Sequence, residues 1–241
     1  TAVNHSVGTI GIAILDSTID GDVNKVTVDE TTGTVMVTQP GVGEGSPVTT
    51  IDCKNGDGTD IEDTAGEAVA IIGSSKLCTS LSDAISTAQN GDMITLLKDV
   101  TASATVVVAD KKLTLNLNGH KLTAATLYTL RVNGNGDLTI IDNSTGTPGE
   151  INNTHDTAST IDVNNGGKLT LGGEGGNNFI VENAQNKTIK ENSAIKVEEQ
   201  GTLTINGGTI RGPKTSEGNR RSVQTFGTTT INDGTFEGEV Q

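Results

Sequence analysis

The fold is decided by the stretch Gly201-Thr202-Leu203-Thr204-Ile205-Asn206-Gly207-Gly208-Thr209-Ile210-Arg211-Gly212, because imperfect copies of it recur through the C-terminal half of the chain. A close copy occupies residues 227–238, and looser copies begin at Gly136, Gly167 and Lys111. Within each copy apolar residues alternate with polar ones, which is the period of a β-strand with one face in a core.

The copies lie 25 to 34 residues apart when each is anchored on the residue before its central threonine: Leu113, Leu138, Leu169, Leu203 and Thr229. The extra residues fall in polar connections, so a constant strand is joined by loops of variable length. This arrangement predicts a solenoid, in which each turn buries its apolar face against the next turn.

Two further strands complete each predicted turn. One is predicted at residues 129–132, 160–163, 194–197 and 222–225, and the other is centred on Ile151, Ile180, Ile210 and Phe236. Corners between strands favour residues that tolerate a positive φ, and such residues occur at Asn133-Gly134, Asn165-Gly166-Gly167 and Asn206-Gly207-Gly208. The sequence therefore predicts an all-β fold, a parallel β-helix with three strands per coil over residues 76–241.

Residues 1–75 are predicted to form a separate N-terminal β region, either a small β domain or a cap on the solenoid. They carry 12 acidic and two basic side chains, a net charge of −10, whereas residues 76–241 carry a net charge of −4. Alternating segments at 25–28 and 34–38 flank a turn-rich connection and predict a hairpin.

A long apolar strand is predicted at residues 7–15, with apolar side chains at Val7, Ile10, Ile12 and Ile14. Such a strand can pair with the open edge of a neighbouring molecule by β-augmentation, so it is a candidate assembly strand. The chain begins without a signal-peptide pattern and stops just after a turn of the repeat, and we expect it to be a piece of a longer protein.

A short amphipathic helix is predicted at about residues 80–90, ahead of a strand at 93–97. Its apolar residues recur at helical spacing, with Ser80 or Ser82 as the N-cap and Asn90-Gly91 at the end: Leu81, Ala84, Ile85 and Ala88. We expect this helix to cap the solenoid, since it would cover core residues that otherwise face water.

Three segments, Ser82-Asp83-Ala84-Ile85, Gly91-Asp92-Met93-Ile94-Thr95-Leu96 and Lys112-Leu113-Thr114-Leu115-Asn116-Leu117-Asn118-Gly119-His120-Lys121-Leu122, resemble the opening of right-handed parallel β-helices of the pectin-lyase-like superfamily. The resemblance covers roughly residues 77–241 and is greatest to non-catalytic modules of surface proteins from Gram-positive bacteria. It implies a right-handed solenoid. It does not imply one activity, because the superfamily includes lyases, hydrolases, tailspikes and adhesins.

One outward column of the predicted fold carries charges of alternating sign. Stacking the strands at 129–132 and its equivalents places Leu130, Ile161, Ile195 and Val223 inward, and Arg131, Asp162, Lys196 and Gln224 outward. Lyases of the resembled fold use an Arg or Lys base beside carboxylates that hold calcium, so the resemblance alone nominates Arg131 and Asp162. We prefer a surface ladder that favours register, because one carboxylate in the column is too few for a calcium site.

A column of threonines is predicted on the strand of the repeat: Thr114, Thr139, Thr170, Thr204 and Thr230. The β-branched side chain suits an exposed strand face. An ice-binding face is the sharper alternative, but it needs two threonine columns side by side, and Asp137 and Lys168 interrupt the second column.

Cys53 and Cys78 are the only cysteines, and they are candidates either for a disulfide or for two buried thiols. The acidic, glycine-rich loop around Cys53 offers weak calcium candidates: Asp52, Asn55, Asp57 and Asp60. The register of an EF-hand fails there, so a solvated acidic turn is the alternative. Apart from that calcium candidate we expect no metal, no cofactor and no catalytic residue.

Composition excludes several function classes. A net charge of −14 without a basic stripe argues against nucleic acid, and no run approaches the roughly 20 apolar residues of a membrane span. Aromatic residues make up 2% of the chain and Trp is absent, so no platform for sugar stacking is evident.

We therefore expect a non-enzymatic, extracellular module of a bacterial surface protein or filament, located at the cell surface. Its expected partners are other copies or segments of the same protein, or host or cell-surface glycans. A polysaccharide lyase or glycoside hydrolase on the same fold is the alternative.

Overall fold

The computed structural model describes residues 25–29, 34–38, 53–55, 68–74, 76–155, 159–183, 192–213 and 221–241. The chain divides into two compact units, Thr1–Ile51 and Asp52–Gln241. In the first unit β1 (Lys25–Asp29) pairs antiparallel with β2 (Thr34–Thr38), which confirms the predicted hairpin. The candidate assembly strand with Val7, Ile10, Ile12 and Ile14 lies outside the described residues.

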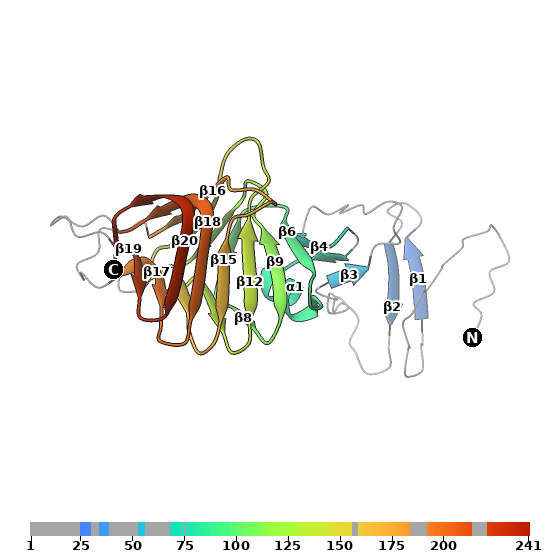
Figure 1. The fold of residues 1–241 in the computed structure, drawn as a ribbon. Helices are drawn as coiled ribbons and strands as arrows, with labels where there is room; N and C mark the ends of the chain where they lie inside the picture. Colours follow the sequence, from blue (N-terminus) through green and yellow to red (C-terminus); the bar gives the residue numbers. More distant parts are fainter. Residues whose placement is uncertain are drawn as a thin grey trace. The chain divides into compact units, whose positions relative to one another are not determined.

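The second unit is a parallel β-solenoid of about four turns, and its strands lie side by side in long stacks (Figure 1). The strand pairing gives three stacks, which we call faces 1, 2 and 3. Face 1 contains β6 (Met93–Leu96), β9 (Lys112–Asn116), β12 (Asp137–Ile141), β15 (Lys168–Leu171) and the first halves of β18 (Thr202–Arg211) and β20 (Thr228–Glu237).

Face 2 contains β7 (Val100–Ala102), β10 (Lys121–Ala124), β13 (Gly149–Asn153), β16 (Phe179–Glu182) and the second halves of β18 and β20. Face 3 contains β8 (Val106–Ala109), β11 (Leu130–Asn133), β14 (Ile161–Val163), β17 (Ser193–Val197), β19 (Arg221–Thr225) and β21 (Glu239–Val240). The prediction of a parallel β-solenoid is confirmed.

The core consists of apolar columns that run from turn to turn. On face 3 the predicted inward set is in register and fully buried: Leu130, Ile161, Ile195 and Val223. On face 1 one column runs through the whole stack: Ile94, Leu115, Ile140, Leu171, Ile205 and Ile231. A slip of one residue would turn each set outward, so burial of these columns fixes the register.

One predicted register is wrong. Ile151 aligns with Val181 and Ile210, whereas Ile180 aligns with Glu150 and is only half-buried. Phe179 and Val181 occupy the core positions on either side of Ile180. The two-residue period of a strand then directs Ile180 to the outer face.

The corner at Asn206-Gly207-Gly208 also differs from the prediction. β18 continues through it from face 1 to face 2, with a register irregularity in place of a break. Gly208 has a φ of +85°, and a Cβ atom there would lie 2.2 Å from Phe179 Cε2. Glycine is therefore required at this corner both by its backbone conformation and by the ring beside it.

The helix α1 (Leu81–Thr87) covers the N-terminal end of the core and packs against β4 (Ala70–Ile72), β5 (Lys76–Cys78) and β8. Its N-cap is Ser80, whose Oγ accepts the Asp83 N–H at 3.0 Å, as one of the two predicted caps.

The helix ends at Thr87, earlier than predicted, because Ala88 adopts an extended backbone. Lys111 compensates the exposed helix end: its Nζ donates to the carbonyl oxygens of Ile85 at 2.9 Å and Ala88 at 3.0 Å, and also to that of Ser86.

An antiparallel extension precedes the solenoid. β3 (Cys53–Asn55) pairs with β5, β5 with β4, and β4 with β6, all antiparallel. Cys53 and Cys78 lie opposite each other in this sheet and are joined by a disulfide. The sequence predicts that residues 52–75 belong to the acidic N-terminal region. In the structure they belong to the same compact unit as the solenoid.

Candidate functional site

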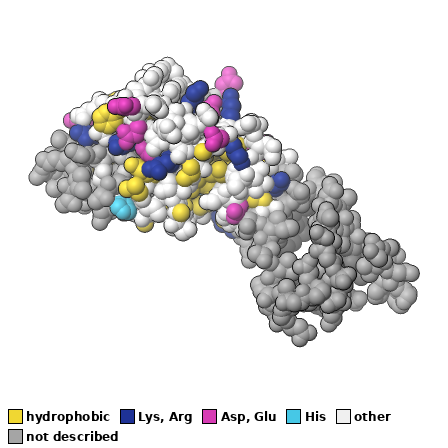
Figure 2. All heavy atoms as spheres, turned by 90° about the horizontal axis from the view of Figure 1, so that it is seen from below, with side chains coloured by type: hydrophobic (Ala, Val, Ile, Leu, Met, Phe, Trp, Pro, Cys, Tyr) yellow, Lys and Arg dark blue, Asp and Glu magenta, His cyan; other side chains and the backbone are white. Residues whose placement is uncertain are grey.

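The Arg131 column, which we define as Arg131, Asp162, Lys196 and Gln224, crosses the outer side of face 3. Parallel pairing of β11, β14, β17 and β19 brings the four residues into register, as predicted. Figure 2 shows a face of the molecule on which charged side chains of both signs lie among hydrophobic ones. The Arg131 column is taken as the candidate site because it places an arginine, an aspartate and a lysine on neighbouring strands.

Asp162 is the central residue of this column. Its Oδ2 accepts hydrogen bonds from Arg131 Nε at 2.8 Å and from Asn164 Nδ2 at 2.7 Å. Only 1% of the side chain is exposed, and within the described part of the chain its Oδ1 has no hydrogen-bond partner. Burial raises the pKa of this carboxyl above its ordinary value, and the Arg131 hydrogen bond opposes the shift. The expectation of an exposed ladder is therefore wrong for Asp162.

The neighbours of Asp162 are also engaged with one another. The Arg131 guanidinium lies 4.7 Å from the centre of the Tyr128 ring, a cation–π arrangement. Lys196 Nζ lies 2.6 Å from Glu198 Oε1, and this hydrogen bond raises the pKa of Lys196. Both cations of the column are therefore paired with a carboxylate, Arg131 with Asp162 and Lys196 with Glu198. Arg131 also lies over the Tyr128 ring.

This arrangement limits the chemistry of the column. A base must have a free lone pair and reach the proton it removes, whereas Arg131 Nε already donates to Asp162. In the ranges that the structure describes, no group of three or more His, Cys, Asp or Glu side chains is arranged to hold a metal ion. Of the weak calcium candidates, Asp52, Asp57 and Asp60 lie outside the described residues, and only the backbone of Asn55 is described, in β3.

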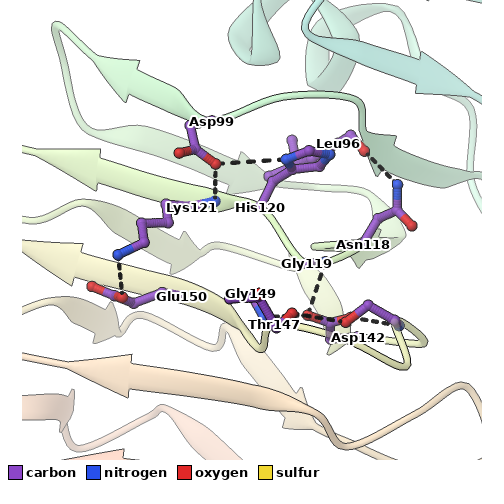
Figure 3. Close-up of polar contacts among 11 residues, drawn as sticks. Leu96, Asp99, Asn118, Gly119, His120, Lys121, Asp142, Thr147, Gly149 and Glu150 are labelled. Carbon is purple, nitrogen blue, oxygen red and sulfur yellow. Dashed lines mark hydrogen bonds and ion pairs between the residues drawn. The ribbon is translucent and has the colours of Figure 1, made fainter.

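A second polar cluster occupies the corner between faces 1 and 2 (Figure 3). His120 Nδ1 lies 3.5 Å from Asp99 Oδ1, and the same oxygen accepts the Lys121 N–H at 2.9 Å. Lys121 Nζ lies 2.9 Å from Glu150 Oε2 on the adjacent strand, which raises the pKa of Lys121. These contacts join successive turns and give His120 a structural partner.

Asp142 is a buried residue that the sequence interpretation missed. Its carboxylate accepts N–H groups from Gly119 at 3.1 Å, from Ser144 at 2.7 Å and from Gly149 (Figure 3). Three backbone donors satisfy the buried charge and hold the connection between β12 and β13 against the preceding turn. The signal in the sequence is the Asp142 to Ser144 spacing of an Asx turn.

The threonine column on face 1 is in register as predicted, from Thr114 to Thr230. Beside it, Asp137 pairs with Lys112 and Lys168, which confirms that charged residues interrupt a second column. Two threonine columns lie side by side only where Thr202 and Thr228 flank Thr204 and Thr230.

No protein-family model, curated protein or solved structure matches this chain. Among the described residues no helix is long and apolar enough to cross a membrane.

Proposed function

We propose that this chain is a non-catalytic, extracellular β-solenoid module of a bacterial surface protein or filament, with a structural or adhesive role. Its architecture fits the right-handed, three-stranded β-helix of the pectin-lyase-like superfamily that the sequence resembles. Its partners are other copies or segments of the same protein, or glycans of a host or a cell surface.

The observation that carries this proposal is the pairing of charged side chains across the turns. Arg131 with Asp162, Lys121 with Glu150, and Arg211 with both Glu182 and Glu237 link neighbouring strands of faces 3 and 2. Such pairs favour one register of the stack, and side chains used in this way are not presented to a substrate.

The disulfide supports an extracellular location. Disulfides persist in oxidising compartments and are rare in the cytosol, where thiols stay reduced. Cys53 and Cys78 join β3 to β5, next to the capped end of the solenoid, where a covalent link holds the antiparallel extension in place.

A polysaccharide lyase or glycoside hydrolase on the same fold is the second candidate. It is favoured by one observation: a buried carboxyl with a raised pKa, Asp162, lies against Arg131 and near Lys196. Perturbed groups beside a specific charge partner are enriched at active sites.

Two products of acidic polysaccharides, measured with and without calcium, separate the candidates: unsaturated uronates, which a lyase forms, and new reducing ends, which a lyase or a hydrolase forms. The proposal expects neither product from the wild-type chain. Formation of either product that disappears in Arg131→Ala, with the fold intact by circular dichroism, would establish the enzyme and overturn the structural role.

A further inference from the structure

The strand β3 is where tension from the N-terminal part of the chain reaches the solenoid unit. Residues 1–51 form a separate compact unit, and the unit that holds the solenoid begins at Asp52, directly before β3. Among the described strands β3 is the outermost in its sheet, whose order begins β3-β5-β4-β6. A pull transmitted along the chain from residues 1–51 therefore acts on an edge strand.

The pairing of β3 with β5 is arranged so that tension would open it from one end. The two strands are antiparallel, and the chain enters β3 at Cys53 and leaves β5 after Cys78, its direct partner. Both connections thus lie at the same end of the pair. Only three residues of β3 pair with β5, so few hydrogen bonds resist the pull, and they would break one after another.

The cap of the solenoid depends on this pair. β5 holds β4, and β4 covers β6, where Ile72 lies opposite Ile94 and Ala70 opposite Leu96. The helix α1 packs against β3, β4 and β5. Separation that began at β3 and continued through β5 and β4 would expose the first strand of face 1 and one side of α1.

We propose that the Cys53–Cys78 disulfide is a force-bearing bond that keeps the cap closed while the module is under tension. It joins the pair of residues at which separation would begin. It transmits the load to Cys78, which is fully buried and lies two residues before Ser80, the N-cap of α1. This inference rests on the proposed role as a surface or filament module, because such a module transmits force.

Single-molecule force spectroscopy on the full chain, held at its two ends, tests the proposal. Oxidised wild type is compared with the double variant Cys53→Ala, Cys78→Ala. It is also compared with wild type reduced by dithiothreitol, which supplies two electrons and two protons and leaves two thiols. Leu203→Ala keeps the disulfide and removes a fully buried side chain from β18, so it is the matched control for lost stability.

Without the disulfide, the antiparallel extension should open before the solenoid and at a lower force. The 25 residues between the cysteines, at about 3.4 Å each, should lengthen the chain by about 85 Å in this early step. The solenoid should then unfold at a lower force than in oxidised wild type, because its cap is already open. The solenoid step in the same trace shows that the molecule was folded.

Oxidised wild type and Leu203→Ala should lack the early step. Three results overturn the proposal. One is a single step that releases extension and solenoid together in the double variant. Another is a solenoid step at the same force with and without the disulfide. The third is an early step of about 85 Å in oxidised wild type.

Failure of this experiment is distinguishable from failure of the proposed function. A single step in the double variant removes the force-bearing role of the disulfide and leaves the non-catalytic role standing. Formation of unsaturated uronates or new reducing ends removes the non-catalytic role, whatever the order of the unfolding steps.

Discussion

The first and last turns of the solenoid bury the same apolar column of face 1 to different extents. Ile94 and Ile231 are the first and last members of the column through face 1, and they are 1% and 43% exposed. Ile94 is covered by β4, where Ile72 lies opposite it, and by Ile85 of α1, which lines an interior cavity with it. In a solenoid the neighbouring layer buries a residue, and the apolar pattern alone does not.

The largest expected effect separates these two residues. Ile94→Ala should lower the free energy of unfolding by about 3 kcal/mol, since it leaves a cavity under the cap. Ile231→Ala should cost less than about 1 kcal/mol in dilute solution, because little area is removed from water there. Urea denaturation of both variants measures the difference, and equal losses would show that both ends are equally covered.

The disulfide is the next test of the capped end. Cys53 and Cys78 are 25 residues apart in sequence, and closing a loop of that size contributes about 3 kcal/mol. The double variant Cys53→Ser, Cys78→Ser should lose that stability, and reduction of the wild type should reproduce the loss. A midpoint unchanged by reductant would show that the antiparallel extension does not stabilise the solenoid.

A smaller effect is expected at the C-terminus of α1. Lys111→Met keeps the apolar stem but leaves the carbonyl groups of Ile85, Ser86 and Ala88 without the ammonium donor. The expected loss is about 1 to 2 kcal/mol, measured by urea denaturation. Lys112→Met, at the exposed neighbouring position, is the matched control and should change stability little.

The smallest effect concerns Asp162, an outward-facing residue that is buried in the middle of the stack. Its folded pKa lies above the unfolded value, so the folded state holds the proton more tightly. Stability due to this group should therefore fall as pH rises from the ordinary aspartate pKa through the raised one. Asp162→Asn should lack this fall.

The measurement for Asp162 is the difference in unfolding free energy between wild type and Asp162→Asn across that pH window. The free energy of unfolding of the wild type should fall relative to that of Asp162→Asn as pH rises. A drift in the opposite direction would show that Arg131 and Asn164 outweigh burial at this carboxyl.

Much of the solenoid is predictable from the sequence because its determinants are local. Alternation sets the inward face of each strand, and the copies at Leu138, Leu169 and Leu203 set the register between turns. The error at Ile180 arose because three apolar residues in succession, Phe179 to Val181, leave the inward face undefined without a neighbour.

For the candidate site, the sequence predicts which residues lie in register but not how deeply each is buried. Register places Arg131 beside Asp162, but burial of Asp162 depends on its surroundings in three dimensions. Asn164 lies two residues further along the same face of the chain, and Tyr128 enters from the connection before β11. The role of Asp142 is not predictable from side-chain patterns, because its partners Gly119 and Gly149 donate backbone N–H groups.

Hydrogen exchange at the two ends of the face 1 column tests the central claim most directly. The account predicts that amides of β6, which pairs with β4 on one side and β9 on the other, are strongly protected. It predicts that β20 amides not bonded to β18 exchange rapidly in this chain. Equal protection of β6 and β20 would contradict the claim that the neighbouring layer, and not the apolar pattern alone, buries and protects the column.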